Sequence, residues 1–175
     1  MHPLTQYVRS IPDFPKPGII FRDIVPLIEN PVALKLAIET LKEAVEPWGP
    51  FDKIAAPEAR GFIFAAPLAI QLNAGLAPMR KPGKLPFKTV SIDYSLEYGV
   101  NSIEMHEDTI KSGDRVLLLD DLLATGGTIN ACRKLIERQG GIVKGAAFII
   151  ELVDLKGRDT LGDLPVFAPV QFEGE

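Results

Sequence analysis

Residues 115–128 read RVLLLDDLLATGGT, and this stretch decides the expected fold. Residues 116–119 are a continuous apolar run, which is typical of a strand buried on both faces of a parallel sheet. Two aspartates and two leucines follow, and then the small residues 124–128. A helical pattern with Ile129 and Cys132 on its apolar side continues towards Gly140. This order predicts an α/β fold with a central, mostly parallel sheet flanked by helices.

The turn between this strand and helix is a predicted anion site. Backbone N–H groups at a helix N-terminus are unpaired, and the helix dipole favours negative charge there. Two carboxylates precede the turn and can accept hydrogen bonds from sugar hydroxyls or hold a hydrated cation. The turn therefore predicts a ribose phosphate as ligand, and the alternative is an ordinary turn with two solvated aspartates. The predicted site consists of Asp120, Asp121, Ala124, Thr125, Gly126, Gly127 and Thr128.

The composition is that of an ordinary globular protein, with 46% hydrophobic and 24% charged residues in a chain of 175. No apolar run is long enough to cross a bilayer and the N-terminus lacks an apolar signal core, so we expect a cytoplasmic protein without membrane contact. A net charge of −4 argues against nucleic-acid binding. The single cysteine, Cys132, is expected in the core.

Three segments outside the central stretch are informative. Residues 11–23 contain three prolines and a glycine, which predicts a turn-rich arm that packs on a core or lines a pocket. Residues 57–61 follow a short apolar strand, at the sheet edge where ligands bind in doubly wound folds. Residues 80–107 begin as a basic loop and continue as an alternating ribbon. From the residues alone, plain packing of the arm and a solvated basic surface remain the simpler interpretations.

Other segments carry no site chemistry. Residues 31–46 predict a helix, with Asn30 as N-cap and Pro31 at the first helical position. Residues 142–152 predict a further internal strand, and residues 153–175 are expected to be irregular.

The segment DDLLATGGT, residues 120–128, resembles the ribose-phosphate motif of the type I phosphoribosyltransferase family. PGIIFRD, PEARGF, RKPGKLP, LEYG and ELVDLKGRDTL resemble further segments of the family, so the resemblance covers nearly the whole chain. It implies the type I phosphoribosyltransferase fold in one domain, residues 1–175, with a hood from about residues 1–30 and a flexible lid at about residues 80–107. PGIIFRD and LEYG are similar to members that act on adenine, which implies transfer of the phosphoribosyl group from phosphoribosyl pyrophosphate to adenine in purine salvage.

The resemblance also implies roles for single residues. Pyrophosphate would be bound by Arg60, Arg80, Lys81 and Lys84. The base would be bound by Ile20, Phe21, Arg22 and Leu152, with Phe21 and Leu152 on opposite faces of its ring. Glu97 would handle the purine proton as the catalytic residue, and Tyr98 would be a cover in the lid. A cis peptide bond is implied between Ala59 and Arg60.

The resemblance further implies Mg²⁺ as cofactor, held mainly by substrate and water without a direct protein ligand, and a homodimer. Two alternatives remain open. One is a phosphoribosyltransferase for another base, and the other is a non-catalytic regulator with this fold. A purely structural function is a third, weaker option.

Overall fold

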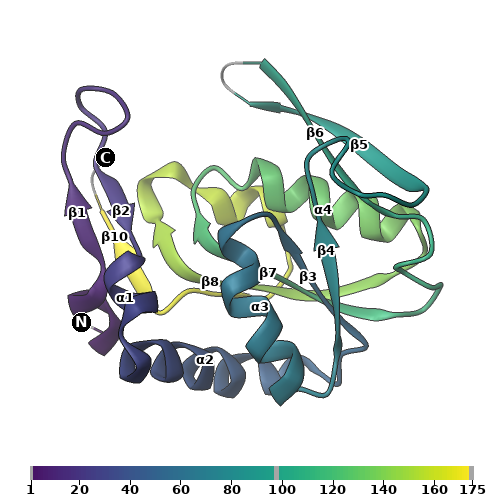
Figure 1. The fold of residues 1–175 in the computed structure, drawn as a ribbon, viewed down its shortest axis with the longest axis horizontal. Helices are drawn as coiled ribbons and strands as arrows, with labels where there is room; N and C mark the ends of the chain where they lie inside the picture. Colours follow the sequence, from purple (N-terminus) through teal and green to yellow (C-terminus); the bar gives the residue numbers. More distant parts are fainter. Residues whose placement is uncertain (1, 97–98, 174–175) are drawn as a thin grey trace.

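A parallel sheet runs through the middle of the molecule (Figure 1). The computed structural model describes residues 2–96 and 99–173, and within them the strand order is β10-β8-β7-β3-β4, with β9 also paired to β8. The pairings of this sheet are parallel. Its strands are β3 (Lys53–Pro57), β4 (Gly75–Met79), β7 (Arg115–Leu123), β8 (Ile142–Leu152), β9 (Val166–Phe167) and β10 (Val170–Phe172).

Helices cover both faces of the sheet, which confirms the expected α/β fold. The helices are α1 (Val25–Glu29), α2 (Pro31–Val45), α3 (Arg60–Gln71) and α4 (Gly127–Arg138). Leu117 and Leu119 of β7 belong to the core cluster under α2 and α3, whereas Val116 and Leu118 belong to the cluster under α4. Because successive strand residues point to opposite faces, a continuous apolar run is needed to bury both sides of β7.

Local signals placed several elements correctly. The Asn30 side chain caps α2, since its Oδ1 accepts hydrogen bonds from the N–H groups of Val32 at 2.9 Å and Ala33 at 3.1 Å. Strand β8 has the predicted bounds, and Cys132 is fully buried in the cluster under α4. Within residues 2–96 and 99–173, no helix is both long and apolar enough to span a membrane.

Two expectations about the sheet were wrong. Strand β7 continues past residue 119 to Leu123, because β8 pairs with it as far as Leu123 opposite Glu151, so Asp120 and Asp121 lie within a strand. The C-terminal segment is not irregular. It forms the 3-10 helices η3 (Val153–Leu155) and η4 (Gly157–Leu161) and then β9 and β10, which add to the free edge of β8. Strands of two and three residues are too short to show a periodic pattern.

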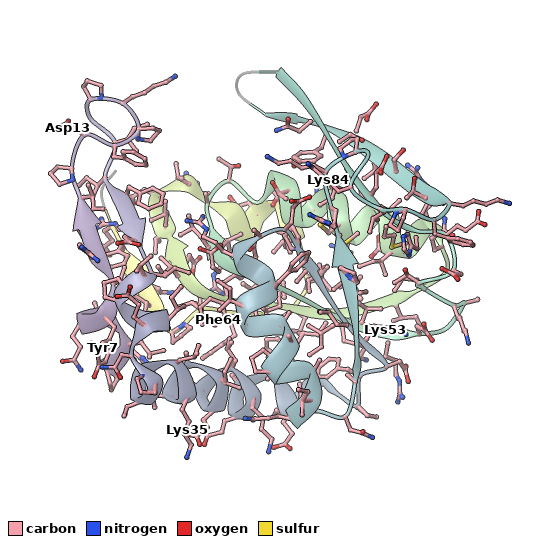
Figure 2. All side chains as sticks on the ribbon, in the orientation of Figure 1. Tyr7, Asp13, Lys35, Lys53, Phe64 and Lys84 are labelled. Atoms are coloured by element: carbon pink, nitrogen blue, oxygen red, sulfur yellow. The ribbon has the colours of Figure 1, made fainter. Side chains whose placement is uncertain are left out.

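Two antiparallel ribbons flank the sheet on the upper side of the molecule in Figure 1. At the left, β1 (Arg9–Ile11) pairs with β2 (Phe21–Asp23), and this ribbon lies in the segment that is predicted to be the hood. At the right, β5 (Thr89–Leu96) pairs with β6 (Gly99–His106), which confirms the predicted ribbon. Figure 2 shows Asp13 at the tip of the hood and Lys84 in the basic loop beside the second ribbon.

Candidate active site

A concave space of about 90 Å³ lies where β7 ends and α4 begins. Helix α4 starts at Gly127, so the N–H groups of its first turn face this space without partners from the helix itself. The structure thus brings most of the predicted ribose-phosphate residues together. The space is lined by Asp120, Leu122, Leu123, Ala124, Thr125, Gly126, Gly127, Thr128 and Ile129.

Gly126 is required at the N-cap of α4 for two reasons. Its φ of +82° lies in the left-handed region that side chains disfavour. A Cβ at this position would lie 2.0 Å from Thr160 Oγ1 and 2.7 Å from the carbonyl oxygen of Gly157. Helix η4 therefore packs directly behind the phosphate loop, residues 124–128, and no larger residue fits between them.

The acidic pair lies beside this loop and contacts Arg60. The Asp121 side chain is only 5% exposed, and the Nε of Arg60 lies 3.0 Å from its Oδ2. The backbone N–H of Asp121 donates to Asp120 Oδ1 at 2.8 Å. Burial raises the pKa of Asp120 well above its ordinary value, and the neighbouring Asp121 carboxylate raises it further. Burial also raises the pKa of Asp121, although Arg60 opposes this shift.

We expect the Asp120→Asn variant to be more stable than the parent protein at neutral pH. A carboxyl whose pKa is raised by folding costs stability once the pH exceeds its ordinary value, because the folded state must ionise a partly desolvated group beside another carboxylate. Asparagine keeps the oxygen that accepts from Asp121 and removes the like charge. The gain should be about 1 kcal/mol, or roughly 2–4 °C in Tm, and should vanish towards about pH 4, where the parent carboxyl is protonated.

Thermal unfolding at a series of pH values measures this effect. The exposed Asp108 provides a matched control, and Asp108→Asn should leave Tm nearly unchanged. If the Asp120→Asn protein melted at a lower temperature than the parent at pH 7, repulsion between the Asp120 and Asp121 carboxylates would not be an important cost to stability.

The hood meets the acidic pair through Arg60. The Arg60 guanidinium lies 5.6 Å from the centroid of the Phe21 ring, and Phe14 contacts the same ring edge-on at 5.2 Å between centroids. Phe21, Arg60 and Asp121 are thus neighbours, although they come from three distant parts of the sequence.

Arg22 points elsewhere. Its guanidinium packs over the Phe172 ring of β10 at 3.9 Å, and its Nη1 donates to Ser10 Oγ. Burial lowers the pKa of Arg22. Leu152, at the end of β8, is paired with Phe172 in the sheet. The structure therefore uses Arg22 to hold the hood against the sheet edge that carries Leu152, and it does not place Arg22 beside Phe21 and Arg60.

Glu58 organises the start of the basic loop, a role that the sequence did not reveal. It accepts a hydrogen bond from the Lys81 backbone N–H at 2.7 Å and lies 3.4 Å from Arg80 Nε. These contacts lower the pKa of Glu58, the Lys81 hydrogen bond most of all. Arg80 Nη1 also donates to the Lys84 carbonyl at 3.4 Å.

The expected position of the cis peptide bond was wrong by one residue, because this bond lies between Glu58 and Ala59.

The second ribbon contacts the phosphate loop through Tyr94, another residue that sequence reasoning missed. The Thr128 hydroxyl donates to the Tyr94 hydroxyl at 3.4 Å. The predicted catalytic Glu97 and the predicted cover Tyr98 lie outside the described residues. Tyr94 belongs to the same YSLEYG segment, but nothing in the sequence distinguished it from an ordinary ribbon residue.

The residues present suit a cation shared with a substrate better than a cation held by protein alone. Within residues 2–96 and 99–173, no cluster of three or more His, Cys, Asp or Glu side chains could hold a metal ion. Asp120 lines the concave space, whereas the carboxylate of its neighbour Asp121 is nearly buried and is paired with Arg60. Mg²⁺ is commonly bound by one or two carboxylates together with water and substrate phosphates.

Comparisons with known proteins agree with this geometry. The phosphoribosyl transferase domain family matches residues 27–161. An adenine phosphoribosyltransferase of Fervidobacterium nodosum is 53% identical over 169 residues, which cover 97% of this chain and 99% of that protein. The chain belongs to the adenine phosphoribosyltransferase family.

Solved structures of this family share the fold. The crystal structure of adenine phosphoribosyltransferase from Thermoanaerobacter pseudethanolicus superposes with a TM-score of 0.93 at 50% identity, covering 97% of this chain and 98% of that one. The Saccharomyces cerevisiae enzyme, in complex with an imino-altritol bisphosphate and adenine, gives a TM-score of 0.89 at 36% identity, with coverage of 95% and 96%.

Proposed function

We propose that the protein transfers the phosphoribosyl group from phosphoribosyl pyrophosphate to adenine, giving AMP and pyrophosphate. The concave space between β7 and α4 is the observation that carries this proposal. The N–H groups at the start of α4 would bind the 5′-phosphate, with the helix dipole adding to the attraction. Asp120 and Asp121, directly upstream, would accept hydrogen bonds from the ribose hydroxyls.

Pyrophosphate would leave towards Arg60 and the basic loop. Arg60 stands at the N-terminus of α3, next to Asp121. Arg80, Lys81 and Lys84 would supply further positive charge when the lid closes. Glu58 supports this proposal, because it holds both Arg80 and the Lys81 backbone at the entrance of the loop.

The base would bind beneath the hood. We propose that the Ile20 backbone reads the adenine edge and that Phe21 and Leu152 pack on opposite faces of the ring. The Arg60 contact with Phe21 supports a base site next to the ribose site. Arg22 would contribute by fixing the hood on β10. The structure of the yeast relative contains adenine, which supports adenine as the base.

The reaction needs no covalent nucleophile from the protein. Departure of pyrophosphate leaves a sugar with oxocarbenium character, which a purine nitrogen can attack directly. Glu97 would accept the purine proton, and Tyr98 would cover the closed site. Cys132 is fully buried and burial raises the pKa of its thiol, so it does not serve as a nucleophile. Closure of the lid would exclude water, which otherwise attacks the same carbon.

We further propose Mg²⁺ as the cofactor, with Asp120 and Asp121 able to contact its hydration shell. The bound ion would neutralise charge on the departing pyrophosphate. We also propose that the whole chain acts as one domain, as a homodimer in the cytoplasm. Size-exclusion chromatography with light scattering would measure the oligomeric state.

An assay with five bases tests the proposed function. Purified protein is incubated with phosphoribosyl pyrophosphate and Mg²⁺, with adenine, hypoxanthine, guanine, xanthine or orotate as acceptor. We expect AMP from adenine, product from the other bases at least about 100-fold more slowly, and strong loss of turnover when Mg²⁺ is chelated. Faster turnover of another base would favour the first alternative. If no base were used, a regulator or structural protein with this fold would be favoured.

A further inference from the structure

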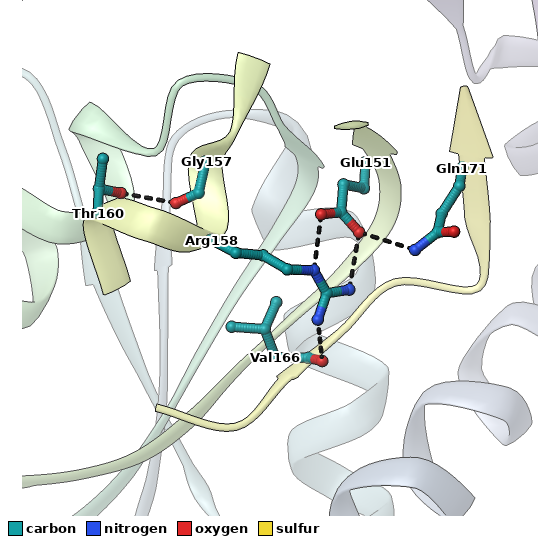
Figure 3. Close-up of polar contacts among 6 residues, drawn as sticks. All are labelled: Glu151, Gly157, Arg158, Thr160, Val166 and Gln171. Atoms are coloured by element: carbon teal, nitrogen blue, oxygen red, sulfur yellow. Dashed lines mark hydrogen bonds and ion pairs between the residues drawn. The ribbon is translucent and has the colours of Figure 1, made fainter. Parts of the chain in front are cut away.

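An ion pair between a buried carboxylate and a half-buried arginine lies behind the phosphate loop and outside the proposed substrate contacts (Figure 3). Glu151, near the end of β8, has a side chain that is only 5% exposed. The Arg158 guanidinium binds it through two parallel hydrogen bonds, from Nε to Oε1 and from Nη2 to Oε2, each at 2.7 Å. This fork geometry is the strongest arrangement available to an arginine and a carboxylate.

The pair joins four segments. Arg158 belongs to η4, and its Nη1 also donates to the Val166 carbonyl of β9 at 2.9 Å. Gln171 of β10 donates from Nε2 to Glu151 Oε2 at 3.0 Å. Figure 3 shows Arg158 reaching from η4 across to Glu151, with Gln171 on the far side of the carboxylate. The hydrogen bonds lower the pKa of Glu151, the Arg158 bond most of all, which keeps the carboxylate charged.

Helix η4 in turn forms the back wall of the phosphate loop. A Cβ on Gly157 would lie 2.2 Å from the Ala124 carbonyl oxygen, and a Cβ on Gly126 would lie 2.0 Å from Thr160 Oγ1. The Gly157 backbone therefore packs directly on the loop, and near the other end of η4 the Thr160 side chain packs on Gly126. The Thr160 hydroxyl donates to the Gly157 carbonyl at 2.7 Å and tightens this turn.

A single 3-10 turn has poor hydrogen-bond geometry and needs outside support to keep its position. Here each end has an arginine anchor. Arg158 ties the start of η4 to the sheet, and Arg133 of α4 donates from Nη1 to the Leu161 carbonyl at 2.8 Å at its end. Without the hydrogen bonds of Arg158, η4 could move away from Gly126 and Ala124. The backbone N–H groups of the loop would then no longer be held in fixed orientations.

We infer that Arg158 and Glu151 are positioning residues for the 5′-phosphate site, acting through η4 on the backbone of residues 124–128. This inference rests on the proposed function. The pair touches neither base nor pyrophosphate in that proposal. It follows that ligands with a 5′-phosphate should depend on the pair, whereas free pyrophosphate should not.

The test compares direct binding of AMP and of pyrophosphate, measured by calorimetry, with steady-state kinetics. In Arg158→Gln, the Kd for AMP and the KM for phosphoribosyl pyrophosphate should rise by about ten-fold or more, a cost typical of a displaced binding group. The Kd for pyrophosphate should stay within about two-fold of the parent value. Glu151→Gln should behave alike, and the double variant should add little, because both changes break one interaction. Arg158→Lys should retain part of the affinity, since lysine keeps the charge but loses the fork.

The Asp52–Arg115 pair is a matched control at the other end of the sheet. It has the same two-bond geometry, with Arg115 Nε and Nη2 each 2.9 Å from the carboxylate oxygens. Arg115→Gln should lower Tm and leave AMP affinity unchanged.

Wild-type AMP affinity in Arg158→Gln, or equal loss of AMP and pyrophosphate binding, would overturn the inference. If Arg158→Gln does not fold, Arg158→Lys and Glu151→Gln decide the question by the same two affinities. Failure of the proposed function would show instead in the parent protein, as absence of turnover with adenine.

Discussion

Replacing Gly126 by alanine is expected to lower the free energy of unfolding by roughly 2–5 kcal/mol, the sum of a left-handed backbone penalty and overpacking. The new Cβ would meet Thr160 Oγ1 at 2.0 Å and the Gly157 carbonyl oxygen at 2.7 Å, and the second of these is backbone that cannot rotate away. Either the phosphate loop or η4 has to shift. Because the N–H groups of this loop would bind the 5′-phosphate, kcat/KM for phosphoribosyl pyrophosphate should fall by at least about 100-fold.

Gly113 separates the two causes. It has a φ of +88°, but a Cβ there would meet nothing within 4 Å. Gly113→Ala should therefore cost only the backbone penalty of about 1–2 kcal/mol and leave kcat/KM unchanged. Denaturant unfolding and steady-state kinetics measure both quantities. If the two variants lost equal stability and both kept activity, close packing of η4 against the loop would not be important.

The second large effect is expected from Glu97→Gln. A purine nitrogen that attacks the sugar carbon must lose a proton, and a glutamine amide cannot accept it. Positioned general bases contribute about 10²–10⁴-fold, so kcat should fall by at least about 100-fold. The affinity for phosphoribosyl pyrophosphate should remain within about three-fold, since its proposed contacts lie on β7, α3, α4 and the basic loop. Turnover by rapid quench and donor binding by calorimetry give the two values.

Glu107 offers the control for this variant, because it is exposed and directly follows β6. Glu107→Gln removes the same charge and should keep full turnover. A wild-type kcat in the Glu97→Gln protein would show that Glu97 has no catalytic role. That result would not contradict the proposed phosphate site.

The tertiary structure also changes how the predicted site residues are understood. Arg22 and Phe21 are adjacent in sequence, yet Phe21 lies by Arg60 and Arg22 lies on Phe172. Neighbouring residues of a strand point to opposite faces. A short sequence motif therefore does not show whether two adjacent residues belong to the same site, because that depends on what packs against each face. Glu58 and Tyr94 were missed for a related reason. Their partners Lys81 and Thr128 are 23 and 34 residues away in sequence.

By itself, the sequence determined the elements whose signals are local. The apolar run of β7, the small-residue turn, the Asn30 cap and the bounds of β8 depend on spacing, propensity and capping within a few residues. Only the tertiary structure decided what stands behind and beside the phosphate loop. Burial of Asp121 against Arg60, the packing of η4 on Gly126 and the fork between Arg158 and Glu151 all join segments brought together by the parallel sheet. Contacts of this kind leave no period in the sequence, because each depends on where two chain segments meet in space.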